Sequence, residues 1–430
     1  MPHPEPLAAE PTRERALPPH AGRGRAKREQ ILRGALAVFA RHGFAGASMD
    51  RLASGARVSK PTLYSHFQSK EGLFVALFEW ACAVHLHWEA PEAAVGAEGE
   101  LQEQMERWLA MALTPEAVFL LQTALSESAR FPQLGELYVR TALEPLKSRL
   151  LPCLQTDRDP EAAATLLCCA LFAFVGFSEI LRGQWVAPVQ RGEFVDGLAD
   201  LVSGRAGVGE AAGIATLPVE PEPVPSEDAG ADERREQTLR AAMAVFVEHG
   251  YTGTSMDMVA AHTGLSKPTL YSHFQDKEGL FSELIARVTI RRSFLLLQPG
   301  LFDAPTAVVF ARQAEALLAK IDDPEYHAVV RLVLREAVRF PELGRLYTRT
   351  VMQPGFRLLG TFLQHCRPRR LPPATLTVLY CTPLIGFVLL HALLGGSRWF
   401  PVERERYSAC LVRLLTGSAP QAEREAGEGA

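Results

Sequence analysis

An internal repeat constrains the fold of this chain more than any other feature. Residues 59–74 read SKPTLYSHFQSKEGLF and residues 266–281 read SKPTLYSHFQDKEGLF, so fifteen of sixteen positions agree at an offset of 207. A second match joins Phe131–Gly135 to Phe340–Gly344 at an offset of 209. Because the offset changes so little along the chain, the sequence holds two copies of one unit of about 200 residues. The second copy is expected to adopt the architecture of the first.

The repeats are expected to be all-α, because no segment alternates apolar and polar residues for long enough to suggest a sheet. Gly176 and Gly386 extend the match at an offset of 210. The stretch between the repeats is rich in Gly, Ala, Pro and acidic residues and is interpreted as a flexible linker. The predicted parts are a disordered tail (1–22), head one (23–72), effector domain one (73–203), the linker (204–232), head two (233–279), effector domain two (280–416) and a disordered tail (417–430).

Each head carries the signals of three short helices. In head one, Ile31, Ala35 and Phe39 fall on one helix face, and Gly43 suits the end of that helix. Ser48 is placed to cap a second helix. The corresponding glycine and serine of head two are Gly250 and Ser255.

A tight turn then leads into a third helix. Ser59 can cap this helix, and Pro61 lies in its first turn, where proline is tolerated. Leu63 and Phe67 face the small core. Lys60, Thr62, Tyr64 and His66 therefore lie on or near the outer face, as does the same set in head two. A short capped helix with outward polar and aromatic side chains suits the major groove of double-stranded DNA.

The segment S-K-P-T-L-Y-S-H-F followed by K-E-G-L-F resembles the TetR family of bacterial regulators, strongly over about 50 residues in each repeat. The resemblance implies two TetR-like units, each a three-helix helix-turn-helix head with a helical effector domain. It also implies a dimer, an inverted-repeat operator read by two heads, and release when a small molecule binds the C-terminal domain. The DNA contacts that it implies, together with Arg57, which we expect to contact phosphate, are Ser48, Arg57, Lys60, Thr62, Tyr64, His66, Lys70, Ser255, Lys267, Thr269, Tyr271, His273 and Lys277.

Arg57 departs from the family pattern, which favours glycine in this turn, as at Gly264. If the turn needs a positive φ, arginine costs about 1 kcal/mol there. A phosphate contact made by Arg57 could offset that cost.

The charges of the two heads differ. Residues 23–80 hold ten Lys and Arg against four Asp and Glu, a net charge of +6. Residues 233–290 hold six against seven, a net charge of −1. Because phosphate attraction dominates affinity for DNA, head one is expected to anchor the protein and head two to contribute less. The whole-chain net charge of −4 gives no indication of nucleic-acid binding.

The effector domains are expected to hold a small-molecule pocket between helices. Core packing is the commoner role for any one aromatic residue, and a ligand site for an apolar or aromatic effector is the alternative. The candidate ligand-binding residues are Phe119, Phe131, Tyr138, Phe172, Phe340, Tyr347, Tyr380 and Phe387.

Chemistry of other kinds is not expected. The sequence has no metal-ligand spacing, no phosphate-binding glycine loop and no nucleophile motif, so we expect neither a cofactor nor an enzyme. Of the seven cysteines, most lie in apolar runs and are interpreted as buried thiols. A redox sensor at the adjacent Cys168 and Cys169 is the alternative.

The apolar segments 162–177 and 374–394 are expected to form the seam of a dimer. The seam could form within one chain, as an intramolecular pseudo-dimer, or between two chains, as a homodimer with four heads. Residues 371–397 carry no Asp, Glu, Lys or Arg, so a membrane span is the alternative to a buried interface helix. Residues 1–22 lack the apolar segment of a signal peptide. We therefore expect a cytoplasmic transcription regulator, with a repressor favoured over an activator. The alternative is a binding protein in which head two no longer contacts DNA.

Overall fold

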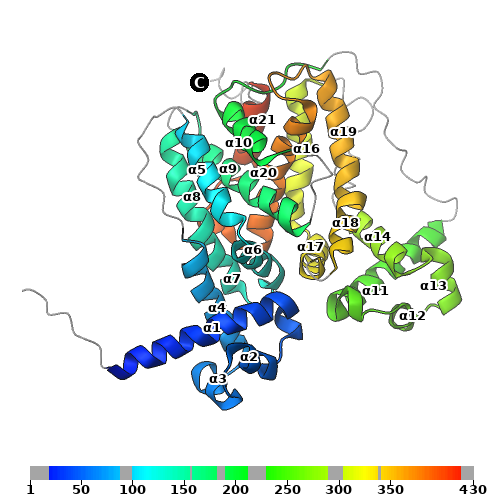
Figure 1. The fold of residues 1–430 in the computed structure, drawn as a ribbon. Helices are drawn as coiled ribbons and strands as arrows, with labels where there is room; N and C mark the ends of the chain where they lie inside the picture. Colours follow the sequence, from blue (N-terminus) through cyan, green and yellow to red (C-terminus); the bar gives the residue numbers. More distant parts are fainter. Residues whose placement is uncertain are drawn as a thin grey trace, which may run out of the picture. The chain divides into compact units, whose positions relative to one another are not determined.

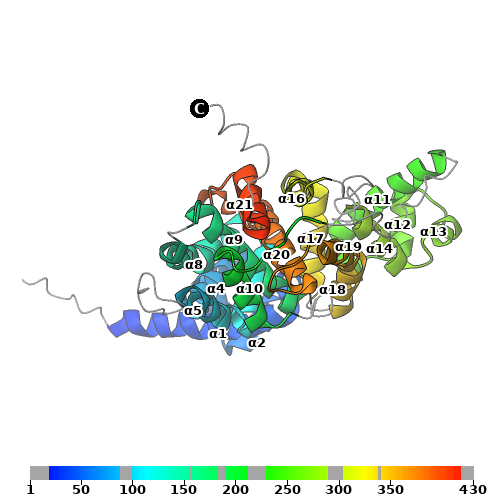
Figure 2. The same ribbon diagram turned by 90° about the horizontal axis from the view of Figure 1, so that it is seen from above.

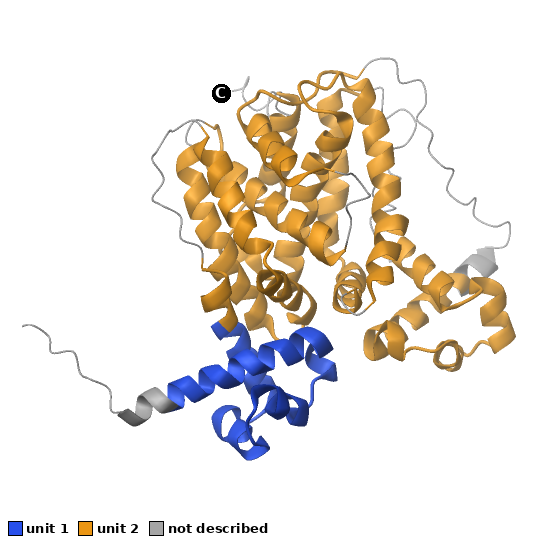
Figure 3. Ribbon diagram, viewed as in Figure 1, with its two compact units in different colours: residues 1–80 blue, residues 81–430 orange. Residues whose placement is uncertain are grey.

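The computed structural model describes residues 19–87, 99–154, 157–181, 189–211, 229–288, 304–337 and 340–417 (Figure 1). The chain forms two compact units, residues 1–80 and residues 81–430 (Figure 3). Helices account for all the regular structure in the described residues, apart from an isolated bridge between Gly207 and Arg369. The all-α prediction is therefore confirmed.

Head one forms the first unit. Its helices are α1 (Pro19–Gly46), α2 (Met49–Ala56), α3 (Lys60–Phe67) and α4 (Lys70–His85), which leads into the rest of the chain. Helix α1 begins inside the predicted tail, of which residues 1–18 lie outside the described part. The head two helices are α11 (Ala229–Gly253), α12 (Met256–Thr263), α13 (Lys267–Phe274) and α14 (Lys277–Val288). In both heads the helices close over the same small core, since Leu63 and Leu270 are fully buried.

The effector domain of the first repeat consists of short helices around one long apolar helix. Several of its helices, and of those in the second repeat, begin with a proline in the first turn, where the missing N–H costs no hydrogen bond. The elements are α5 (Glu100–Ala112), α6 (Pro115–Glu127), α7 (Pro132–Tyr138), η1 (Val139–Leu143), α8 (Glu144–Leu150), η2 (Leu151–Leu154), α9 (Pro160–Val175), η3 (Gly176–Ile180) and α10 (Arg191–Val202).

The effector domain of the second repeat follows the same order. Its elements are α16 (Thr306–Leu318), η5 (Ala319–Asp322), α17 (Pro324–Glu336), α18 (Pro341–Tyr347), η6 (Thr348–Met352), α19 (Gln353–His365), α20 (Pro373–Leu393), η7 (Gly396–Arg398) and α21 (Arg404–Thr416). Head two packs on this domain, because α11 and α14 both contact α17.

The two effector domains pack against each other within the single chain. Helices α9 and α20 form the largest helix pair in the fold, flanked by contacts of α9 with α21 and of α20 with α10 (Figures 1 and 2). A second pairing joins α6 to α17, where Gln122 Nε2 donates to Leu334 O at 2.7 Å. The close approach of α9 and α20 requires Gly386, because a Cβ at this position would lie 2.0 Å from Cys169 O.

The helices α9 with η3 and α20 are long and apolar enough to cross a membrane. In the fold, 78% and 83% of the most apolar 18-residue window of each is buried inside the protein. Their apolar surface is therefore covered by other helices, as it would be in a protein core.

The helix starts correct the alignment of the repeats in this region. Pro160 begins α9 and Pro373 begins α20, while Arg191 begins α10 and Arg404 begins α21. Both pairs give an offset of 213. The match of Gly176 to Gly386 at an offset of 210 is wrong, because Gly386 lies within α20 whereas Gly176 begins η3, after the end of α9.

The linker is shorter than the predicted range 204–232. Its first residues pack on the second repeat, since the backbone N–H of Val208 donates to Leu415 O and that of Gly209 to Cys366 O, each at 2.8 Å. Ala211 N donates to Thr306 Oγ1. At the other end, helix α11 already begins at Ala229. Apolar side chains such as Val208, which is 1% exposed, explain why this segment packs rather than remaining a coil.

Candidate nucleic-acid interface

The second and third helices of each head are capped as the sequence predicts. In head one, Ser48 Oγ accepts from Arg51 N at 3.3 Å and Ser59 Oγ accepts from Thr62 N at 3.2 Å. In head two, Ser255 and Ser266 accept the equivalent bonds from Met258 N and Thr269 N. These caps satisfy N–H groups that would otherwise lack partners and fix where the third helix begins.

The turn between the helices needs a left-handed residue in both heads. Arg57 has φ 54° and ψ 49°, and its counterpart Gly264 has φ 72° and ψ 9°. The condition of a positive φ is therefore met at Arg57. The arginine side chain is exposed, so it is free to extend away from the head.

The third helices, α3 and α13, expose the same face in both heads. Leu63 and Phe67 are buried beneath α3, as Leu270 and Phe274 are beneath α13. Tyr64 is 42% exposed and Tyr271 is 46% exposed, which is unusual for large apolar side chains in this fold. The other predicted contacts are exposed (Ser48, Ser255, Lys60, Lys267, His273) or half-buried (Thr62, Thr269, His66, Lys70, Lys277).

The first lysine of each third helix pairs with an aspartate of the second helix. Lys60 Nζ lies 3.0 Å from Asp50 Oδ1, and Lys267 Nζ lies 2.7 Å from Asp257 Oδ2. The hydrogen bond to Asp50 raises the pKa of Lys60. Both pairs are solvent-exposed, and exposed pairs of this kind are weak. A phosphate oxygen can therefore replace the aspartate. The acidic residue two positions after each capping serine is the only sign of these pairings in the sequence.

Lys70 and Lys277 have a structural role that the sequence did not suggest. Lys70 Nζ donates to Phe44 O and Ala47 O at 3.1 Å and lies 4.3 Å from the centroid of the Phe44 ring. Lys277 makes the same bonds to Tyr251 O and Thr254 O, each at 3.0 Å. Two of the three ammonium hydrogens are thereby engaged inside the head. At most one remains for phosphate, so the phosphate contacts of these lysines stay a prediction.

The basic residues of the first helices differ between the heads. Arg28 lies over the Phe67 ring at 5.2 Å, and its counterpart Arg235 lies over the Phe274 ring at 4.9 Å. Arg235 is also bound to Glu283 at 2.5 Å. Head one has Ala76 at the position of Glu283. The guanidinium of head two is thus neutralised locally, in agreement with the lower net charge of that head.

The aromatic residues proposed as ligand contacts do not gather in one place. Tyr138 lies 6.5 Å from Phe172 in the first repeat, whereas Tyr380 packs on Phe310 and donates to its carbonyl oxygen at 2.7 Å. Phe387 stacks on Tyr407.

Most of these candidate aromatics are buried, and the rest are half-buried. Burial raises the pKa of Tyr138, Tyr347 and Tyr380 far above the usual range. The buried candidates are Phe131, Tyr138, Phe172, Tyr347, Tyr380 and Phe387, and the half-buried ones are Phe119 and Phe340. Core packing accounts for the positions of the buried candidates, and the ligand contacts remain a prediction.

Comparison with known proteins matches the heads and part of the second effector domain. Residues 31–77 and 239–284 each match the model of the bacterial regulatory proteins of the tetR family, and residues 309–369 match that of the C-terminal domain of AefR-like transcriptional repressors.

Individual relatives match shorter stretches. The repressor BepR of Brucella suis biovar 1 is 33% identical over 86 residues, which are 20% of this chain and 41% of BepR. The activator FasR of Mycolicibacterium smegmatis is 48% identical over 56 residues, 13% of this chain and 26% of FasR. The chain thus spans less than half the length of these relatives. The flavonoid-responsive regulator FrrA, a solved structure, is 29% identical over 37% of this chain and 81% of its own, with a TM-score of 0.27.

The capped second and third helices define the protein as a helix-turn-helix protein with two heads. Both heads match the same family of bacterial regulators, so the chain carries two TetR-like units in tandem. The relatives named above are transcription regulators, not enzymes.

Proposed function

We propose that the chain is a DNA-binding transcription regulator whose two heads read two similar half-sites of an inverted repeat. The observation that carries this proposal is the identity of the two third-helix surfaces. Residues 59–68 and 266–275 have the same sequence, the same caps and the same exposed face. Equal reading surfaces require nearly equal half-sites. They would lie about 34–36 Å apart if both heads dock on one face of the duplex.

The regulator is proposed to be a repressor that an apolar or aromatic small molecule releases from DNA. Phe119 and Phe340, the two candidate aromatic side chains that are only half-buried, support this effector class. The relatives include both repressors and an activator, so the sign of regulation needs its own test. A reporter placed behind the selected operator would fall in expression when a repressor is supplied and rise with an activator.

The proposal is tested by selecting bound fragments from bacterial genomic DNA at about physiological salt and footprinting the fragments that bind. Protection of two similar half-sites in inverted orientation is expected. Protection of one half-site would favour the second candidate, a protein in which head two has lost its DNA contact. The ion pair of Arg235 with Glu283 and the net charge of −1 favour that candidate. Absence of any enriched fragment would contradict both.

A further inference from the structure

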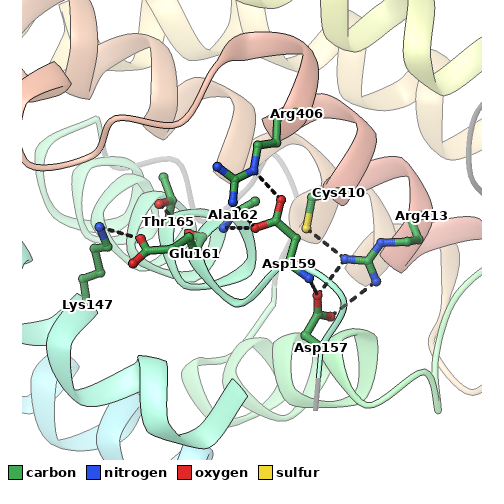
Figure 4. Close-up of polar contacts among 9 residues, drawn as sticks. All are labelled: Lys147, Asp157, Asp159, Glu161, Ala162, Thr165, Arg406, Cys410 and Arg413. Carbon is green, nitrogen blue, oxygen red and sulfur yellow. Dashed lines mark hydrogen bonds and ion pairs between the residues drawn. The ribbon is translucent and has the colours of Figure 1, made fainter. Parts of the chain in front are cut away.

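Two ion pairs join the repeats beside the seam between the effector domains. Arg413 Nη2 on α21 lies 2.8 Å from Asp157 Oδ1, just before α9 (Figure 4). Arg370 Nε, just before α20, lies 2.6 Å from Asp200 Oδ2 on α10. Each pair therefore links the final helix of one repeat to the residue that precedes the long seam helix of the other.

These two pairs are the same interaction made twice. At the offset of 213 given by the helix starts, Asp157 corresponds to Arg370 and Asp200 corresponds to Arg413. The first repeat supplies the acid in both pairs, and the second repeat supplies the base in both. A pair of identical repeats could not have this arrangement, because each position would then carry the same charge on both sides.

A neighbouring position has the same polarity. Glu193 on α10 corresponds to Arg406 on α21 at the offset of 213. Arg406 binds both oxygens of Asp159 at 2.6 Å (Figure 4), whereas Glu193 accepts a hydrogen bond from Thr375 near the start of α20. The bidentate bond to Arg406 lowers the pKa of Asp159. At these three pairs of equivalent positions, the first repeat carries an acid and the second repeat carries a base.

The carboxylates of the two equivalent pairs are removed from water. The side chains of Asp157 and Asp200 are 5% and 8% exposed, and that of Arg413 is 19% exposed. Arg205, at the end of the first repeat, binds the second oxygen of Asp200 at 2.8 Å. These two carboxylates are costly to leave opposite a like charge, unlike the exposed pairs of the heads, although the side chain of Arg370 is itself 57% exposed.

We propose that this acid and base division makes the first repeat select the second repeat and reject a second copy of itself. In a seam between two first repeats, Asp157 would face Asp200. In a seam between two second repeats, Arg370 would face Arg413. The chain therefore closes on itself, and the four-headed homodimer paired copy by copy is excluded. The inference deepens the proposed function by naming the partner of each repeat, but it does not depend on DNA binding.

Three variants of the full chain test the proposal. The base variant carries Asp157→Arg and Asp200→Arg, the acid variant carries Arg370→Asp and Arg413→Asp, and the swap variant carries all four changes. Melting temperature and mass in solution are measured for each variant. A control with the same change of charge as the base variant, Glu103→Arg with Asp322→Arg, breaks only exposed pairs inside single repeats, with Arg107 and Arg404.

The wild-type chain is expected to have the mass of one chain. The base and acid variants should each melt roughly 5 °C or more below the control, and the swap variant should regain part of both losses. The recovery of melting temperature in the swap variant is the decisive measurement. Arg205 remains next to position 200 in every variant, so the separate losses of the base and acid variants also include its effect. The base and acid variants, mixed in equal amounts, should form a complex with the mass of two chains, because the charges then match only between chains.

A wild-type chain whose repeats pair with their own kind in a dimer would overturn the proposal. Base and acid variants that melt like the control would also overturn it. The same holds if the loss of melting temperature in the swap variant equals the sum of the losses in the base and acid variants. If the base variant fails to fold, the swap variant decides the matter alone. A failure to bind DNA in the selection experiment leaves these outcomes unchanged, so the two proposals can fail separately.

Discussion

Arg57 and Gly264 occupy the same left-handed position, with φ 54° and φ 72°, so the two heads meet one backbone requirement with very different residues. Glycine adopts this conformation without strain, whereas a residue with a Cβ gives up about 1 kcal/mol. The presence of arginine at an exposed turn of the more basic head is consistent with a contribution to binding rather than to folding.

Replacing Arg57 with glycine is expected to stabilise the chain by up to about 1 kcal/mol and to weaken binding to operator DNA. The dependence of log affinity on log salt should fall in slope by about one. Thermal melting and binding titrations at several salt concentrations measure both effects. Unchanged affinity and slope would remove Arg57 from the interface.

His391 provides a pH-dependent contribution to stability. Its ring packs 4.0 Å from that of Phe387, and its Nδ1 lies 3.1 Å from Ser397 Oγ. Burial, with a smaller effect of Arg404, lowers the pKa of His391 to about 4. Because the unfolded state binds the proton more readily, stability from this group is complete above pH 6.5 and is lost as the pH falls from there towards 4.

The His391→Gln variant should therefore lose less stability than the wild type between pH 7 and pH 4.5. The difference is expected to grow by at most about 1.4 kcal/mol per pH unit. Melting temperatures of both chains across this range check the expectation. Parallel pH profiles would show that His391 titrates normally in the folded chain.

Single residues differ in how far their roles can be predicted from the sequence. The capping serines follow from rules that act over three or four residues, and the structure confirms them. The bonds from Lys70 to Phe44 O and Ala47 O join residues 23 and 26 positions apart. No local pattern encodes such contacts, so a lysine that holds the head together looks like any surface cation.

At the scale of elements, the seam depends on how closely α9 and α20 approach. A Cβ at Gly386 would meet Cys169 O at 2.0 Å, whereas a Cβ at Gly176 would have nothing within 4 Å. Gly386→Ala must push the two helices apart and should destabilise the chain by about 1–3 kcal/mol. Gly176→Ala, the matched control, should be neutral or slightly stabilising because alanine favours helix. Equal melting temperatures for the two variants would contradict the close approach.

The two heads are expected to contribute unequally to DNA binding. Lys60 belongs to the head with a net charge of +6 and Lys267 to the head with −1. Lys60→Ala should lower affinity more than Lys267→Ala and reduce the salt slope by about one. Lys320→Ala, which removes a lysine paired with Asp323 in the effector domain, is the control. Equal losses from the two head variants would show that local charge does not rank the heads.

The elements themselves were largely readable from the sequence, because amphipathic faces, caps and prolines mark most helix starts. The alignment of the repeats after residue 160 was not, since two apolar helices can be matched in more than one register. The observed helix starts give the offset of 213, which also matches Cys168 with Cys381 and Phe174 with Phe387. The predicted linker was too long, because its composition is dominated by small and acidic residues. The few apolar side chains among them, such as Val208, pack on the fold.

At the scale of the whole molecule, pairing within one chain has a thermodynamic signature. Dimers melt at temperatures that rise with protein concentration, whereas folding within one chain does not depend on it. The melting temperature of the wild-type chain is expected to stay constant over a hundredfold dilution, roughly from 50 to 0.5 µM. Calorimetry or fluorescence melting measures this directly. A melting temperature that rises with concentration would show that the stable seam joins two chains.

The sequence left open whether the seam forms within a chain or between chains, because hydropathy predicts that a helix is buried but not which helix packs against it. The charges beside the seam indicate which repeat pairs with which. Their pairing could not be recognised from the sequence, because it depends on where the final helices lie relative to the starts of α9 and α20.

The division of acids and bases between the repeats also matters for how such a protein can change. In a homodimer every substitution is inherited by both subunits, so the seam and the reading helices can alter only in ways that suit a symmetric pair. Here each substitution occurs once. The seam has used this freedom, whereas α3 and α13 have kept one sequence. Changing α3 alone would give a regulator for an operator with two different halves, a specificity that no dimer of identical chains can encode.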